Sequence, residues 1–255
     1  MTEVKAKKFL GQHFLTDENI AAKIVDSLSA DTTHILEIGP GMGVLTKYLI
    51  AKPDKDFHVV EIDRESVAYL HDHYPTLDII EGDFLRYDLS TLFHKRFSII
   101  GNFPYNISSQ ILFKVFDNRD NVTEVVGMFQ KEVAERVAAG PGSKTYGILS
   151  VLLSAFYNIE YLFTVHEHVF NPPPKVKSAV IKLTRNNVEH LECDEKLFVQ
   201  VVKAGFNQRR KTLRNALRQL NMPIENIGED ILAKRAEQLS VEQFIYITKN
   251  IQSCM

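Results

Sequence analysis

Short apolar runs alternate with amphipathic segments along the first three quarters of the chain. Apolar runs with the length of buried strands occur at 34–38, 57–62, 77–80, 97–101 and 122–130. Two further strands are predicted at 161–165 and 177–184. Segments with an apolar helical face lie around them, at about 17–28, 44–50, 107–116, 131–139 and 147–157. Seven strands with helices between them predict a doubly wound, Rossmann-like α/β sheet.

The pattern changes after about Val188, where only helical periodicity remains. Helices are predicted there at about 196–206, 209–220, 231–239 and 241–251. A chain of 255 residues has room for one α/β domain and a small appendage. We therefore expect a sheet domain over 1–187 and a small all-α C-terminal domain over 188–255.

Composition narrows the class of protein. The hydrophobic content of 45% is ample for a core, while the net charge of −2 excludes a globally basic nucleic-acid binder. Cys193 and Cys254 match no metal-binding spacing, so we expect no metal site, and such sparse cysteine use is typical of the reducing cytoplasm. We expect no signal peptide and no membrane span, because no apolar run is long enough.

A glycine-rich loop, Gly39-Pro40-Gly41-Met42-Gly43, follows the predicted strand 34–38 and precedes a helix. Strand, glycine loop and helix form the usual architecture of a nucleotide site. Pro40 removes one backbone N–H, and Val44 breaks the spacing of a dinucleotide-binding loop. The loop therefore favours a ligand without phosphate, although a simple tight turn remains the alternative.

Acidic residues follow the next two predicted strands. Glu61 lies 20 residues after Gly41, the offset at which a carboxylate accepts hydrogen bonds from a ribose diol. Asp83 can accept from the exocyclic amine of adenine, while Ile62 or Phe84 covers the ring. Each acid could instead be an ordinary surface residue, and Asp63 is expected to cap the helix that begins at Arg64. Together these strand ends predict one adenosine site.

The tetrapeptide Asn102-Phe103-Pro104-Tyr105 follows the strand predicted at 97–101. Its residues suit methylation of an amine on an aromatic ring, a poor nucleophile because its lone pair is delocalised. The Asn102 amide oxygen and the Phe103 carbonyl can accept the two N–H bonds and localise that lone pair. Pro104 adds no donor, and Tyr105 offers a face for base stacking. A plain strand-to-loop turn is the alternative.

A basic segment lies on each side of these motifs in the sequence. Lys7 to Leu15 reads KKFLGQHFL, which could be a packed surface arm or a flap that closes over a ligand. Between Lys203 and Arg218 there are six basic residues and no acid, and Arg210, Arg214 and Arg218 recur every four residues. This spacing predicts one basic helix face. Such a face could simply be solvated, but the absence of acids favours a phosphate-binding patch.

The motifs GQHFL, LEIGPGMGVLT, VEID, GDF, NFPYNIS, FNPPPKVKSAV and FNQRRKTLRNAL, in this order, resemble those of the ribosomal RNA adenine dimethyltransferases. The likeness covers nearly the whole chain. It implies S-adenosylmethionine as cofactor, with contacts from His13, Leu15, Gly39, Gly41, Glu61, Ile62, Asp83, Phe84 and Asn102. It implies that Asn102 meets the target amine and that Tyr105 and Phe170 sandwich the target adenine. We expect Arg209, Arg210, Lys211 and Arg214 to bind RNA. The sequence departs from the family pattern at His13, where Asn is common.

The resemblance implies N6,N6-dimethylation of two adjacent adenines in the 3′-terminal hairpin loop of small-subunit (16S) rRNA during ribosome biogenesis. The expected partners are rRNA and the small ribosomal subunit or its precursor, and we expect a monomer in the cytoplasm. Three alternatives remain open: methylation of large-subunit rRNA, methylation of DNA adenine, or a ribosome assembly factor that binds without turnover.

Overall fold

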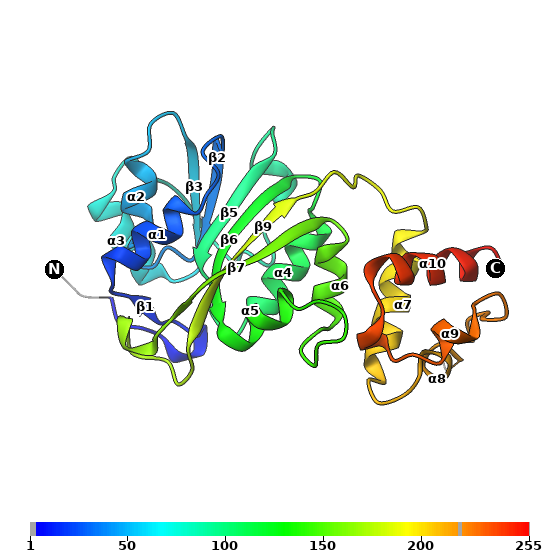
Figure 1. Cartoon of the computed structure of the whole chain (residues 1–255). Helices are drawn as coiled ribbons and strands as arrows, with labels where there is room; N and C mark the ends of the chain where they lie inside the picture. The colour runs from blue at the N-terminus through cyan, green and yellow to red at the C-terminus, as the bar shows by residue number, and fades with distance from the viewer. Residues whose placement is uncertain (1–3, 219–220, 255) are drawn as a thin grey trace. The chain divides into compact units, whose positions relative to one another are not determined.

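The computed structural model of the chain describes residues 4–218 and 221–254 (Figure 1). These residues form two compact units. The first unit contains the chain up to Ala134 and Glu160–Arg185. The second contains Glu135–Ile159 and the chain from Asn186 onward. The segment 135–159, which sequence reasoning placed in the sheet domain, thus clusters with the C-terminal helices.

A seven-stranded sheet with the order β4-β3-β2-β5-β6-β9-β7 confirms the predicted α/β architecture (Figure 1). The pairs β3–β4, β2–β3, β2–β5 and β5–β6 are parallel, and β6–β9 is antiparallel. The strands are β2 (His34–Ile38), β3 (Asp56–Glu61), β4 (Asp78–Glu81), β5 (Phe97–Asn102), β6 (Val122–Gln130), β7 (Tyr157–Val165) and β9 (Ser178–Arg185). Because the order of the chain reverses at β2, the crevice beyond the carboxyl ends of β2 and β5 is where a ligand is expected.

Buried β-branched and aliphatic residues hold the centre of the sheet. Ile35 on β2, Ile99 on β5 and Val125 and Val126 on β6 are all buried. Strands buried on both faces read as continuous apolar runs, which is why the pattern of the sequence located these strands well. The polar residues that follow the runs are then left at the carboxyl edge.

Two helices of the first unit begin at aspartate caps. Asp17 accepts from the Ile20 N–H at the start of α1 (Glu18–Asp26), and Asp63 accepts from the Glu65 N–H at the start of α3. An Asp side chain at this position satisfies an N–H that a first helical turn leaves without a partner, and the predicted cap at Asp63 is confirmed. The other helices that begin in this unit are α2 (Thr46–Ile50), α4 (Ser108–Asp117) and α5 (Lys131–Val137), and α3 spans Arg64–His73.

A second, two-stranded sheet joins the N-terminal arm to the segment before β9. Strand β1 (Phe14–Leu15) pairs antiparallel with β8 (Phe170–Asn171), and the Thr16 N–H donates to the Val169 carbonyl at 2.8 Å. Sequence reasoning treated the second segment as a stiff loop only. Its first residues are a strand because the arm supplies the hydrogen-bonding partner, which lies more than 150 residues away in sequence.

The second unit is helical: α6 (Ile148–Ser154), α7 (Glu195–Asn207), α8 (Leu213–Arg218), α9 (Glu229–Leu232) and α10 (Val241–Gln252). The single helix predicted at 231–239 is wrong, because α9 ends at Leu232 and a short 3-10 turn follows at Ala236–Gln238. The Lys234 carbonyl between them accepts from the Leu213 N–H of α8 at 2.8 Å, so a tertiary partner replaces a helical one. No helix within the described ranges is long and apolar enough to cross a membrane.

Candidate active site

A cavity of about 170 Å³ lies at the carboxyl ends of the parallel strands. The N-terminal arm, the glycine loop and the residues after β3, β4 and β5 line it. Nine of the predicted site residues are among the lining: His13, Gly39, Gly41, Glu61, Ile62, Asp83, Phe84, Asn102 and Tyr105. The cavity therefore brings the predicted adenosine site and the predicted amine site together in the first unit.

The glycine loop requires glycine at its centre. Gly41 has a φ of +57°, a left-handed conformation that side chains disfavour, and a Cβ there would approach the Phe14 ring to 2.9 Å. The Gly41 N–H donates to Glu61 Oε2 at 3.1 Å. The loop is thus held from one side by the arm and from the other by the carboxylate at the end of β3.

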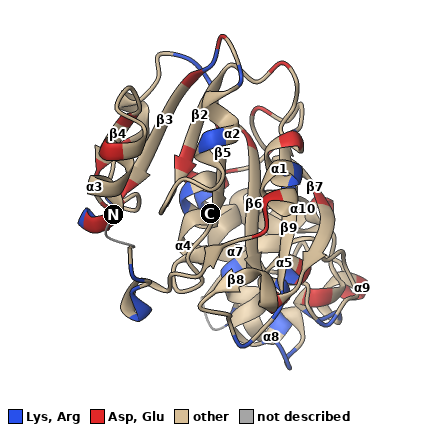
Figure 2. Ribbon diagram, turned by 90° about the vertical axis from the view of Figure 1, so that its left-hand side faces the viewer, with Lys and Arg blue, Asp and Glu red and all other residues tan. Residues whose placement is uncertain are grey.

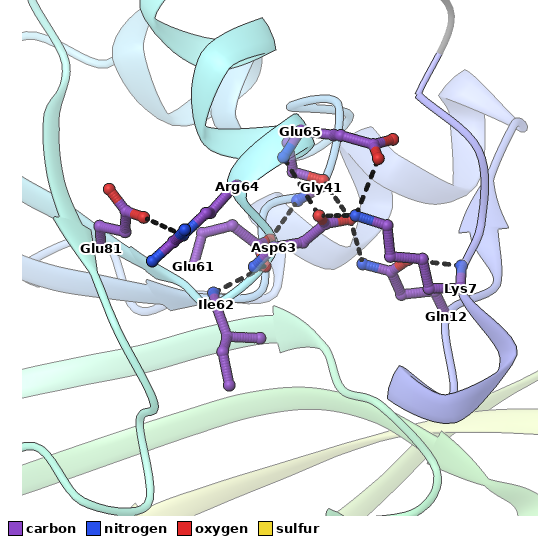
Figure 3. A network of polar contacts seen from close by, with 10 residues as sticks. Lys7, Gln12, Gly41, Glu61, Ile62, Asp63, Arg64, Glu65 and Glu81 are labelled. Carbon is purple, nitrogen blue, oxygen red and sulfur yellow. Dashed lines mark hydrogen bonds and ion pairs between the residues drawn. The ribbon is translucent and has the colours of Figure 1, made fainter.

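Glu61 anchors this edge of the sheet (Figure 3). Only 4% of the residue is exposed, and Oε1 accepts the N–H groups of Ile62 at 2.8 Å and Asp63 at 2.9 Å. Burial raises the pKa of Glu61, and these N–H bonds together with the one from Gly41 counteract the rise. Each carboxylate oxygen has two lone pairs, so Glu61 can hold the loop and still accept from a ligand hydroxyl.

Ile62 presents an apolar surface next to that carboxylate. The residue is 50% exposed, unusually high for isoleucine, and it lines the cavity. Phe84, the other predicted cover for an adenine ring, lines the cavity but is buried. Asp83 accepts the Leu85 N–H at 2.9 Å through Oδ1, and its Oδ2 lies 3.5 Å from Arg86 Nε. An exposed apolar face between two carboxylates fits a flat polar heterocycle.

The N-terminal arm is tied to the start of α3 by a polar network that sequence reasoning missed (Figure 3). The Lys7 ammonium contacts Asp63 and lies 3.2 Å from a Glu65 oxygen, and Gln12 Nε2 donates to Asp63 Oδ2 at 3.2 Å. Burial would raise the pKa of Asp63, but the hydrogen bonds from Lys7 and Gln12 outweigh it and hold that pKa below its usual value. The arm is therefore fixed over the cavity, and nothing local in KKFLGQHFL indicates these partners.

Asn102 and Phe103 place acceptors at the end of β5. The Asn102 Nδ2 donates to the His13 carbonyl at 2.9 Å, which uses one of the two amide N–H groups and fixes the orientation of the amide, whose oxygen is an acceptor. The Phe103 ring is buried over Gly101 and Gly127, where added Cβ atoms would come within 2.6 Å and 2.2 Å of it. With its ring locked in the core, the polar group that Phe103 offers is its carbonyl.

Tyr105 is held at both its hydroxyl and its ring. The hydroxyl hydrogen-bonds to the buried Ser178 Oγ, a partner that sequence reasoning did not single out. Burial raises the pKa of Tyr105, so the phenol stays protonated. The His13 ring lies 5.2 Å from the Tyr105 ring at 33°, and His13 Nδ1 donates to the Pro172 carbonyl at 2.8 Å. Strand β9, which carries Ser178, thus fixes the orientation of the predicted stacking surface.

Leu15 and Phe170 do not reach the main cavity. Both are 4% exposed, they pair across the β1–β8 sheet, and they belong to the hydrophobic core around Val126 and Met128. Leu15 borders a smaller cavity of about 40 Å³ next to Asn102. Phe170 is thus absent from the lining of the main cavity, and its predicted role in stacking on the target adenine with Tyr105 stays a prediction.

The basic residues predicted to bind RNA lie in the second unit, and two of them form ion pairs with acidic residues. Arg209 Nε donates to Glu237 at 3.0 Å, and its NH2 group contacts the Lys144 and Tyr146 carbonyls. Arg214 forms an ion pair with Glu229. Figure 2 shows blue on α8 and red on α9. A stretch without acids in sequence is thus partly neutralised by residues from later in the chain.

Arg210 and Lys211 are exposed, and they precede α8, which begins only at Leu213. The predicted helix face shared by Arg210, Arg214 and Arg218 is therefore wrong for Arg210, because Arg210 lies in the turn 208–210 before the helix. The RNA-binding role of the cluster stays a prediction. Across residues 4–218 and 221–254, no group of three or more His, Cys, Asp and Glu residues could hold a metal ion.

The chain is similar to known rRNA-modifying proteins along nearly its full length. The sequence model of the ribosomal RNA adenine dimethylase family matches residues 3–253. A ribosomal RNA small subunit methyltransferase A of Cytophaga hutchinsonii is 62% identical over 254 residues, covering 97% of this chain and 98% of that protein. The protein of the same name in Bacteroides thetaiotaomicron is 58% identical over 260 residues, covering 100% and 97%.

Two crystal structures share the fold. A dimethyladenosine transferase from Plasmodium falciparum superposes with a TM-score of 0.78 at 26% identity, over 94% of this chain and 98% of that one. The 23S rRNA methyltransferase ErmE superposes with a TM-score of 0.69 at 23% identity, over 92% and 99%, which establishes the fold alone. Because the family's sequence model spans nearly the whole chain and both bacterial relatives are at least 58% identical, this chain belongs to the ribosomal RNA adenine dimethylase family.

Proposed function

We propose that this protein uses S-adenosylmethionine to dimethylate N6 of two adjacent adenines in the 3′-terminal hairpin of small-subunit rRNA. One observation carries the proposal. A single cavity is lined by the acids after β3 and β4 and by the Asn102–Tyr105 segment after β5. The first group of residues suits an adenosine-containing donor, and the second suits an aromatic amine as acceptor.

The lining residues fit the cofactor. Glu61 can accept from ribose hydroxyls, Asp83 can accept from the adenine amine, and the exposed Ile62 side chain can cover the adenine ring. The glycine loop brings backbone close to the cavity without a side chain in between. When bound, S-adenosylmethionine supplies an activated methyl group, so the protein's task is to bind, align and exclude water.

The Asn102–Tyr105 segment would activate the target amine. The Asn102 oxygen and the Phe103 carbonyl accept the two N–H bonds of N6, which draws the nitrogen toward tetrahedral geometry. Pro104 adds no competing N–H, and the Tyr105 ring, fixed by Ser178, stacks on the base. Alignment of this kind can lower a barrier by about 7–11 kcal/mol. The proton then leaves to water, since alkylation makes the nitrogen acidic.

The target adenine must leave its stack to reach the cavity, which costs a few kcal/mol and least in a loop. The second unit would hold the surrounding RNA through its exposed Arg210 and Lys211. We propose that residues 1–187 carry catalysis and that 188–255 bind RNA. We also propose that the protein acts as a monomer on the small subunit or its precursor in the cytoplasm.

The test is to incubate the protein and S-adenosylmethionine with small subunits that lack these methyl groups, and in parallel with large subunits. Mass spectrometry of rRNA fragments should show a gain of four methyl groups in one small-subunit fragment with two adjacent adenines. Methylation of large-subunit rRNA instead would favour the 23S-type alternative. Binding to the subunit without methyl transfer would favour a non-catalytic assembly factor.

A further inference from the structure

The N-terminal arm exposes one aromatic side chain that neither folding nor the proposed reaction uses. Phe9 is 77% exposed, the highest exposure among the large hydrophobic residues of the part of the chain described by the structure. It lies in a short 3-10 turn, Lys8–Leu10. A single exposed hydrophobic residue is ordinary on a protein surface, so what distinguishes Phe9 is its position next to the cavity and among basic residues.

Phe9 lies at the rim of the cavity. Its carbonyl accepts from Asn106 Nδ2 at 3.3 Å, and the next two residues, Leu10 and Gly11, line the cavity together with Asn106. Gly11 approaches so closely that an added Cβ would come within 2.7 Å of Asn106 Oδ1. The backbone that carries Phe9 is therefore packed directly onto the residue after Tyr105.

The arm around Phe9 is both anchored and basic. The Lys7 side chain contacts Asp63 and Glu65, which fixes the turn to α3. Lys5 and Lys8 are exposed, so positive charge lies near Phe9 in the sequence on the surface of the arm. An exposed aromatic ring preceded by two exposed lysines on an anchored backbone is typical of a stacking platform for single-stranded nucleic acid.

We infer that Phe9 is a second nucleotide subsite, on which the base next to the target adenine stacks while Lys5 and Lys8 contact the adjoining phosphates. The inference rests on the proposed function and specifies how its substrate is held. When one of two adjacent adenines enters the cavity, the other is the nearest base to the rim. Phe9 stabilises that base after it has lost its partner in the stack.

The first experiment measures the affinity of undermethylated small subunits for the wild-type protein and three variants. Phe9→Ala and Phe9→Leu should raise the dissociation constant by roughly 5- to 150-fold, the range for loss of one stacked base, and Phe9→Trp should keep it near wild type. Tyr161→Ala is the matched control, an exposed aromatic on β7 that is absent from the cavity lining, and it should change nothing. Melting temperatures should stay equal, since Phe9 is exposed.

A second experiment identifies the rRNA nucleotide that Phe9 contacts. Phe9 is replaced by the photo-crosslinking analogue p-benzoylphenylalanine, and the cross-linked rRNA nucleotide is mapped by primer extension. The expected cross-link is to a nucleotide adjoining the target adenine. A cross-link elsewhere, or a Phe9→Leu variant that binds like wild type, overturns the inference. Weaker S-adenosylmethionine binding by Phe9→Ala would also overturn it, because Phe9 would then cover the cofactor. If the wild-type protein itself does not methylate the subunits, the proposed function fails instead.

Discussion

The hydrogen bond between Tyr105 and Ser178 provides a sharp test of how the stacking surface is positioned. Ser178 begins β9 and is 0% exposed, so its hydroxyl has lost its contact with water. Tyr105 lies on the rim after β5, and its hydroxyl bonds to that serine across 73 residues of sequence. Ser178→Ala and Tyr105→Phe each remove one partner, and Tyr105→Phe leaves the buried Ser178 hydroxyl without it.

The expected magnitudes follow from that burial. Tyr105→Phe should lower the free energy of unfolding by about 1–3 kcal/mol, because the buried Ser178 hydroxyl left without a partner bears its full desolvation cost. Ser178→Ala should cost less, about 0.5–1.5 kcal/mol, because the Tyr105 hydroxyl that it leaves belongs to a residue that is only partly buried. The double variant should cost less than the sum of the two, with a coupling of about 0.5–3 kcal/mol for groups in direct contact. Catalysis should fall as well, since the Tyr105 ring is then free to tilt away from the target base.

The assay combines denaturant unfolding with methyl-transfer kinetics on undermethylated small subunits. Both single variants should lose kcat while the affinity for S-adenosylmethionine, measured by calorimetry, stays at the wild-type value. Ser150→Ala is the matched control, because Ser150 is an equally buried serine whose hydroxyl bonds the Arg136 carbonyl in the second unit. It should cost stability without loss of kcat. Strictly additive variants, or a control that loses kcat to the same extent, would refute the positioning role of Ser178.

Three further predictions test the cavity and the basic cluster. Asn102→Ala should lower kcat by about 10²–10³-fold with little change in RNA affinity, because the Asn102 oxygen accepts more strongly only as N6 becomes tetrahedral. A variant that retains more than about a tenth of wild-type kcat would exclude that role. Glu61→Ala should weaken binding of the demethylated cofactor product at least about tenfold in calorimetry, because charge-assisted hydrogen bonds are worth about 1.5–3 kcal/mol each. Unchanged affinity would mean that Glu61 only anchors the glycine loop. The variant with Arg210→Gln and Lys211→Gln should weaken RNA binding and flatten the slope of log K against log salt by roughly one to two units, at constant melting temperature. Arg209→Gln, which removes contacts with Glu237 and two carbonyls, should lower the melting temperature instead, and the opposite pattern would contradict this division of roles.

Elements whose signals are local could be predicted from the amino-acid sequence alone. Buried strands such as β2 and β6 were read from their apolar runs with the bounds that the structure has. Asp63 was read as a helix cap because capping depends on residues a few positions apart. Glu61, Asp83 and Asn102 were read as neighbours because the carboxyl ends of parallel strands meet at one edge.

The tertiary structure decided everything that depends on a partner far along the chain. Phe170 lies in the core and not at the cavity because β8 pairs with the N-terminal arm, which no periodicity around Phe170 encodes. Lys7 and Ser178 joined the site only through contacts with Asp63 and Tyr105.

The charge around the basic cluster also depends on residues far along the chain. Arg209 and Arg214 stand in a stretch without acids in sequence, yet Glu237 and Glu229 neutralise them in space. Hydrophobic periodicity and capping report the free energy of a segment over a few residues, so they place strands and helix starts. Ion pairs, strand pairing at an edge and the burial of a single ring depend on distances between remote segments, which are defined only when the chain has folded.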